Sequence, residues 1–127
     1  MILTNVNLHV NLVMTRREIV FYRKPDGECP IQRFLDSLPS KAAQKAAWVL
    51  KLMEDLNRVP ANYFCKLTGT EGIWEFRIKW GSDLFRVLAF FDGQKVVLTH
   101  GFMKKTRKTP YREIIRAENY KTDYFQD

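Results

Sequence analysis

The chain has 127 residues, enough for one domain with a hydrophobic core and too few for two ordinary domains. Hydrophobic residues make up 46% of the sequence, which argues against disorder, and no apolar run approaches the roughly 20 residues that a membrane helix needs. The formal net charge of +7, from 21 lysines and arginines against 14 aspartates and glutamates, favours an acidic partner such as nucleic acid.

The first predicted elements are a strand and two helices. Residues 18–24 (EIVFYRK) predict a strand, which the turn-forming residues 25–27 (PDG) end. Apolar residues at helical spacing predict a short helix over 30–38 and a second helix over 40–57, with Ser40 as the N-cap of the second. Two consecutive helices therefore precede the main run of strands.

A short strand over residues 63–67 leads into three antiparallel strands between residues 72 and 102. In the first of these strands apolar and charged residues alternate, as they do in a strand with one buried face. The apolar set is Trp74, Phe76, Ile78 and Trp80, and the charged set is Glu75, Arg77 and Lys79.

The pairing of the first two of these strands follows from their loop. Gly81-Ser82 is a good two-residue hairpin loop, because glycine at the first position suits a type II′ turn. This loop places Arg77 directly opposite Arg86. Like charges in that position are destabilising. A bound anion such as a phosphate, lying between the two guanidinium groups, removes the penalty.

A second hairpin signal, Asp92-Gly93, fixes the face of the third strand. It predicts that Val96, Leu98 and His100 share the aromatic face with Phe85. Histidine suits proton transfer near neutral pH, but at this position a histidine satisfied within the core is the favoured interpretation.

A basic segment and a last helix complete the chain. Thr109 and Pro110 predict a helix start, as N-cap and first helical residue, and apolar spacing extends the helix to about residue 124. Runs of helices beside runs of strands predict an α+β fold. The basic segment contains Lys104, Lys105, Arg107 and Lys108.

Several short motifs, taken in order, resemble the HigB-like branch of the RelE/ParE toxin superfamily, a branch that includes phage-derived toxin-like proteins. They are GIWEFR at 72–77, FRVL at 85–88, HGF at 100–102, KKT at 104–106 and TP at 109–110. The resemblance implies a single RelE-like domain over residues 14–127, with residues 1–13 as an N-terminal extension. In that fold a twisted antiparallel sheet carries an N-terminal helical hairpin on one face and a C-terminal helix.

The resemblance also implies a function. A protein of this branch is a type II toxin, a metal-independent endoribonuclease of the cytoplasm that cleaves mRNA on the ribosome and needs no cofactor. Its partners are then the mRNA, the ribosomal RNA and a HigA-like antitoxin with a helix-turn-helix DNA-binding domain. Two alternatives stay open: a ParE-like toxin that inhibits gyrase, and an inactive phage-derived binding module.

Candidate site residues follow from the register and the resemblance together. Arg86 matches the arginine of the family's Tyr/Phe-Arg strand motif, and Arg77 matches a basic position of the preceding strand. With Lys105 they are the catalytic candidates, since cations stabilise charge that grows on a phosphodiester. The phosphate-binding candidates are Lys104, Lys79, Arg107 and Lys108, and the acid/base candidates are His100 and Tyr111. Cys29 and Cys65 lack metal-site spacing and are interpreted as reduced thiols.

Overall fold

The computed structural model describes residues 17–56, 58–105 and 107–126. The proposed extension at 1–13 lies outside the described residues, as do Asn57 and Thr106. The order of elements confirms the α+β prediction. These elements are β1 (Glu18–Phe21), α2 (Pro30–Ser37), α3 (Ser40–Asp55), β2 (Phe64–Lys66), β3 (Trp74–Trp80), β4 (Asp83–Asp92), β5 (Lys95–Met103) and α4 (Tyr111–Phe125).

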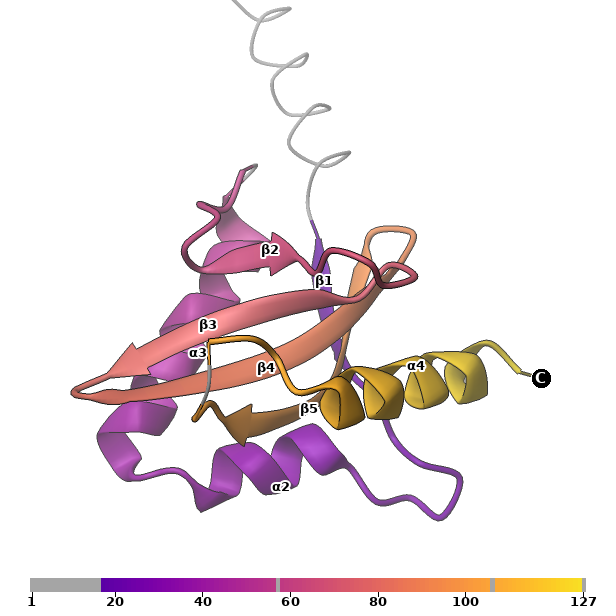
Figure 1. Ribbon diagram of the computed structural model, residues 1–127, viewed down its shortest axis with the longest axis horizontal. Helices are drawn as coiled ribbons and strands as arrows, with labels where there is room; N and C mark the ends of the chain where they lie inside the picture. Colours follow the sequence, from indigo (N-terminus) through magenta and orange to yellow (C-terminus); the bar gives the residue numbers. More distant parts are fainter. Residues whose placement is uncertain (1–16, 57, 106, 127) are drawn as a thin grey trace, which may run out of the picture.

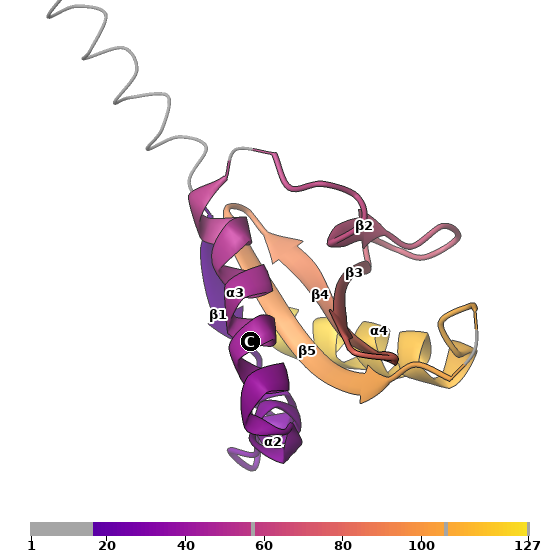
Figure 2. The ribbon, with the colours of Figure 1, turned by 90° about the vertical axis from the view of Figure 1, so that its left-hand side faces the viewer.

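The five strands form one sheet in the order β1-β5-β4-β3-β2 (Figure 1). All neighbours are antiparallel except β1 and β5, which are parallel, so the sheet is mixed rather than wholly antiparallel as the resemblance implied. Parallel neighbours need a long connection, and all elements from α2 to β4 lie between β1 and β5 in the chain. Figure 2 shows α2 and α3 on one face of the sheet and α4 on the other.

The face under α2 and α3 holds the larger hydrophobic core. The predicted apolar face of β3 and β4 supplies Phe76, Ile78 and Val87, all fully buried. Gly101 lets α2 lie close to β5, because a Cβ there would stand 2.3 Å from the ring of Phe34. The backbone of β5 therefore serves as a packing surface for the first helix.

A second core lies under α4. Leu88 and Phe90 of β4 and Val97 of β5 pack there with Ala117 of the helix. The polar end of the same face carries Glu75, Arg77 and Arg86 and forms the wall of a pocket at the start of α4.

The first hairpin confirms the predicted register. Gly81 has a φ of +60°, as the first position of a type II′ turn requires, and Arg77 pairs directly with Arg86. In the second hairpin Asp92 pairs with Lys95, so its loop begins at Gly93, one residue later than predicted.

The face predicted for His100 was wrong. A β-bulge interrupts the pairing of β4 with β5, so that Leu88 faces His100 while Ala89 faces Leu98. Thr99 is the extra residue, and its hydroxyl donates a 3.0 Å hydrogen bond to the carbonyl of Leu88. One extra residue reverses the side-chain alternation, which moves His100 onto the face of the arginines.

The two predicted helix caps were also wrong. The N-caps are Pro39 for α3 and Pro110 for α4, neither with a side-chain cap, and Ser40 is already helical. Thr109 lies before the cap, and its hydroxyl donates to the carboxylate of Glu75. A residue predicted to cap a helix therefore bonds to the sheet.

Candidate active site

A pocket of about 460 Å³ opens where β3 and β4 meet the loop between β5 and α4. The strands supply one wall, the β5–α4 loop a second, and the segment after β2 together with the first turn of α4 the rest. The lining residues are Leu67, Thr68, Glu75, Arg77, Arg86, Lys104, Arg107, Lys108, Thr109 and Ile114.

Glu75 is the centre around which the pocket is arranged. Its side chain is fully buried, which for a carboxylate requires cationic or hydrogen-bonding partners. Arg86 donates to its Oε1, Arg77 Nε lies 3.5 Å from the same oxygen, and Thr109 donates to its Oε2. One carboxylate thus joins β3, β4 and the β5–α4 loop.

Each of the two arginines has one buried nitrogen, Nε, without a hydrogen bond to the described residues, although Arg77 Nε lies within ion-pair distance of Glu75. A buried unsatisfied donor is costly, and an anion with several acceptor oxygens can satisfy it. Arg86 is almost fully enclosed, whereas 39% of the Arg77 side chain is exposed. Arg77 is therefore the more accessible of the two for a ligand.

Lys104 faces the arginines from the β5–α4 loop. Its ammonium donates to the carbonyl of Arg107. Partial burial, followed by the nearby charge of Arg86, lowers the pKa of Lys104 below its usual range. A lysine with a lowered pKa releases a proton more readily than a free one.

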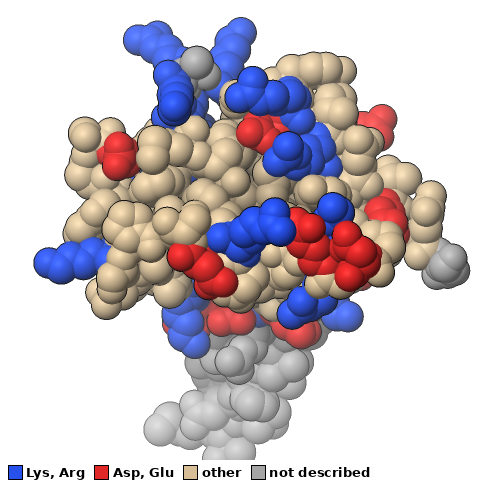
Figure 3. All heavy atoms as spheres, turned by 90° about the horizontal axis from the view of Figure 1, so that it is seen from below, with Lys and Arg blue, Asp and Glu red and all other residues tan. Residues whose placement is uncertain are grey.

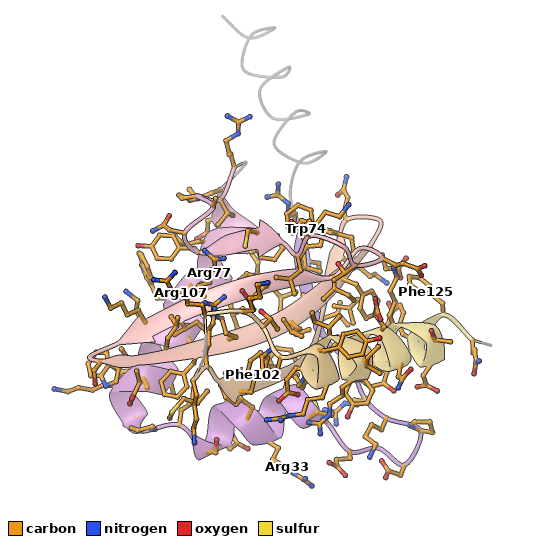
Figure 4. The ribbon with its side chains drawn as sticks, in the orientation of Figure 1. Arg33, Trp74, Arg77, Phe102, Arg107 and Phe125 are labelled. Atoms are coloured by element: carbon orange, nitrogen blue, oxygen red, sulfur yellow. The ribbon has the colours of Figure 1, made fainter. Side chains whose placement is uncertain are left out.

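The charge of the pocket is strongly positive. Among its lining residues five are basic and one is acidic. Figure 3 shows Lys and Arg side chains gathered at the upper edge of that view, where the β5–α4 loop lies. Arg77 and Arg107 lie side by side over β3 in Figure 4, whereas Arg33 projects from the lower edge of the molecule in this view. The pocket is therefore suited to an anion such as a phosphodiester.

Some of the predicted residues lie elsewhere. Lys105 and the strongly exposed Tyr111 line an adjoining pocket that shares Lys108 and Thr109 with the first. Lys79 is exposed on β3 and lines neither pocket. Of the two neighbouring lysines, Lys104 and not the catalytic candidate Lys105 thus lies with the arginines.

His100 belongs to a buried polar cluster between β5 and α4. Its Nε2 lies 3.2 Å from Glu113 Oε1, its Nδ1 lies 3.1 Å from Thr99 Oγ1, and Arg116 approaches the same carboxylate at 3.8 Å. Burial lowers the pKa of His100 to about 4, although Glu113 opposes the shift. The imidazole is therefore neutral near pH 7.

Thr109 and Glu113 hold the polar side chains of this region, but neither has a functional role in the sequence prediction. Thr-Pro is a common helix start, and this pattern predicts Thr109 as a cap alone. Glu113 lies four residues before Ala117 and so shares the buried stripe of α4. A carboxylate in line with the buried residues of a helix is the signal that points to it.

The described residues contain neither a candidate metal site nor a membrane-spanning helix. No three His, Cys, Asp or Glu side chains come together there as a metal site requires. None of the helices in the described part of the chain is long and apolar enough to cross a membrane.

A family model, "Phage derived protein Gp49-like (DUF891)", matches residues 33–122, which is most of the chain. The protein therefore belongs to the Gp49-like family of phage-derived proteins. This family is associated with RelE-like, toxin-like proteins, which agrees with the predicted resemblance at the level of the superfamily and not of the HigB-like branch. No curated protein matched the chain.

Proposed function

We propose that this protein is a toxin of the HigB-like branch of the RelE/ParE superfamily and that it cleaves mRNA. The pocket of Arg77, Arg86 and Lys104 carries the proposal, because three cationic side chains face one space with only a buried carboxylate among them. Family membership supports the toxin class.

In the proposed reaction the RNA supplies its own nucleophile. The 2′-hydroxyl attacks the adjacent phosphorus and loses its proton to water, while the bond to the 5′-oxygen breaks. The products are a 2′,3′-cyclic phosphate and a 5′-hydroxyl. Arg77 and Arg86 stabilise the negative charge that grows on the phosphoryl oxygens, and preorganised donors of this kind are worth about 10²–10³ each in rate.

Lys104 donates the proton that the departing 5′-oxygen needs. Its lowered pKa brings it closer to the operating pH, where general acids are most effective. His100 is enclosed by Glu113 and Thr99 and has no part in this step. Lys105 and Tyr111, in the adjoining pocket, contact the RNA next to the scissile phosphate.

The partners belong to the same proposal. The excess of basic side chains suits docking on ribosomal RNA, where phosphate contacts dominate. A HigA-like helix-turn-helix antitoxin neutralises the toxin in the cytoplasm.

Induced expression in a bacterial host tests the function. We expect the wild type to arrest growth and to cut mRNA within translated regions, as mapped by primer extension. Arg77→Gln and Lys104→Gln should each lower the cleavage rate about 100-fold or more. Arg33→Gln is the matched control: it removes an arginine that is ion-paired on α2, away from the pocket.

The outcomes separate the alternatives. Growth arrest with intact mRNA would contradict an RNase and favour a gyrase-directed toxin of the ParE type. Absence of arrest in the wild type would favour an inactive binding module. Equal cleavage by Arg77→Gln and Arg33→Gln would place the active site elsewhere.

A further inference from the structure

Thr109 connects the β5–α4 loop to the buried carboxylate under the pocket. Its hydroxyl donates to Glu75 Oε2, a contact between residues 34 positions apart in the chain. The helix that follows does not use this hydroxyl, because Pro110 is the N-cap of α4 and the cap has no side-chain hydrogen bond. The Thr109 side chain therefore serves the sheet and the pocket rather than the helix.

The other oxygen of the same carboxylate holds the arginines. Arg86 donates to Glu75 Oε1, and Arg77 Nε lies 3.5 Å from it. The terminal torsion of a glutamate, about its Cγ–Cδ bond, is broad, so a donor at the second oxygen further restricts the orientation of the carboxylate that the arginines hold. Thr109 thus influences the orientation of both guanidinium groups through Glu75, to which its hydroxyl donates.

Glu75 itself has no access to a ligand, since its side chain is fully buried. Its effect on a bound phosphodiester passes through the arginines. The same bond also holds the loop that carries Lys104 and Arg107 against the strands. Position is critical for this chemistry, because a displacement of about 1 Å can cost about 100-fold in rate.

We propose that Thr109 is a positioning residue: its bond to Glu75 orients Arg86 and Arg77 and seats the β5–α4 loop as the opposite wall of the pocket. This inference rests on the proposed RNase function for its catalytic consequence. The structural half, that the Thr109 hydroxyl orders the Arg86 guanidinium, stands without it.

The test compares Thr109→Val, which keeps the shape of the side chain and removes its hydroxyl, with Thr109→Ser, which keeps the hydroxyl and removes the methyl group. Thr122→Val is the matched control, because Thr122 lies exposed on α4 and its hydroxyl makes one local bond of 3.0 Å to the carbonyl of Glu118. Each purified variant is assayed with ribosomes for kcat and KM of cleavage of a bound mRNA. The Nε–Hε signals of Arg86 and Arg77 are recorded by NMR without RNA.

We expect Thr109→Val to lower kcat about 10- to 100-fold with a smaller change in KM, and to shift or broaden the Arg86 Nε–Hε signal. Thr109→Ser should recover both readouts, and Thr122→Val should match the wild type. If Thr109→Val does not fold, Thr109→Ala takes its place in both measurements.

An unchanged Arg86 signal in the variant without the hydroxyl would overturn the proposal, whatever the cleavage rate. A changed signal with unchanged cleavage would overturn the catalytic part. If the wild type cleaves no RNA, the proposed function fails on its own, and the Arg86 signal still decides whether Thr109 orders the guanidinium.

Discussion

Two buried carboxylates, Glu75 on β3 and Glu113 on α4, lie at the same face of the sheet, and their nearest partners differ in charge. Glu75 faces two guanidinium groups, which stay charged at every pH a protein tolerates. Glu113 faces the imidazole of His100, which burial keeps neutral near pH 7. The same residue type thus supports a permanent positive field at one end of the face and a pH-sensitive tie between β5 and α4 at the other.

The position of α4 explains the difference. The helix covers Leu88, Phe90 and Val97, and the His100–Glu113 contact is enclosed where it meets the sheet. The pocket lies at the start of the helix and stays open, with Arg77 partly exposed. A polar group closed in by a helix contributes to stability, whereas one beside an open pocket can also meet a ligand.

The largest expected effect comes from breaking the enclosed pair at Glu75. Arg86→Ala should lower the free energy of unfolding by about 3–5 kcal/mol, because it removes the main partner of a buried carboxylate. Urea denaturation measures the change. Arg33→Ala, which breaks an exposed ion pair with Glu28, should cost less than about 1 kcal/mol.

A double variant tests the cause of that destabilisation. Glu75→Gln with Arg86→Gln removes both charges, so it should be more stable than Arg86→Ala alone. If Arg86→Ala costs no more than Arg33→Ala, the carboxylate is not dependent on its arginine. The expected destabilisation is also the reason for testing catalysis with Arg77→Gln rather than Arg86→Ala.

A smaller effect should separate the two carboxylates by pH. The pKa of His100 falls from the ordinary 6.5 to about 4 in the folded protein. Between these values the unfolded chain binds a proton that the folded His100 does not, so stability falls as the pH falls from about 6.5 towards 4. The decrease is on the order of 1–3 kcal/mol.

Thermal unfolding at a series of pH values measures this decrease. His100→Gln should have a flatter stability profile across the same window. Thr122→Val, which changes an exposed residue of α4 without adding or removing a titratable group, should follow the wild type. Parallel profiles for all three proteins would mean that His100 does not titrate differently on folding.

The smallest expected effect concerns salt. Each phosphate that a cationic side chain neutralises on single-stranded RNA contributes about 0.7 to the slope of log K against log salt. Arg77→Gln should reduce the slope by this amount, measured by fluorescence anisotropy with an RNA whose 2′-hydroxyls are replaced by hydrogen. Arg33→Gln should leave the slope unchanged. A wild-type slope for Arg77→Gln would mean that Arg77 binds no phosphate.

The arginine pair could be predicted because its cause is local. Gly81-Ser82 is a two-residue loop, and a two-residue loop fixes the pairing of both strands, so Arg77 and Arg86 had to meet. The α+β class followed from periodicity in the same way. Both predictions needed only residues close together in sequence.

The rest of the site depends on contacts that the sequence does not encode locally. Lys104 and Lys105 are equivalent as neighbours in the sequence, and only the path of the loop brings Lys104 to the arginines. Thr109 has the sequence pattern of a helix cap, but its hydroxyl donates instead to Glu75, which is distant in the sequence. The predicted face of His100 was wrong because nothing in the pattern marks the bulge at Thr99.

That bulge sets the phase of everything after it in β5. Because Thr99 shares its place opposite Leu88 with His100, Gly101 turns to Phe34 and Phe102 pairs with Arg86. In an unbroken ladder Thr99 alone would face Leu88, so the imidazole would turn towards α2 and a residue without a side chain would stand beside Arg86. One irregular pairing thus directs Gly101 of β5 towards α2 on one face of the sheet and Phe102 towards α4 on the other.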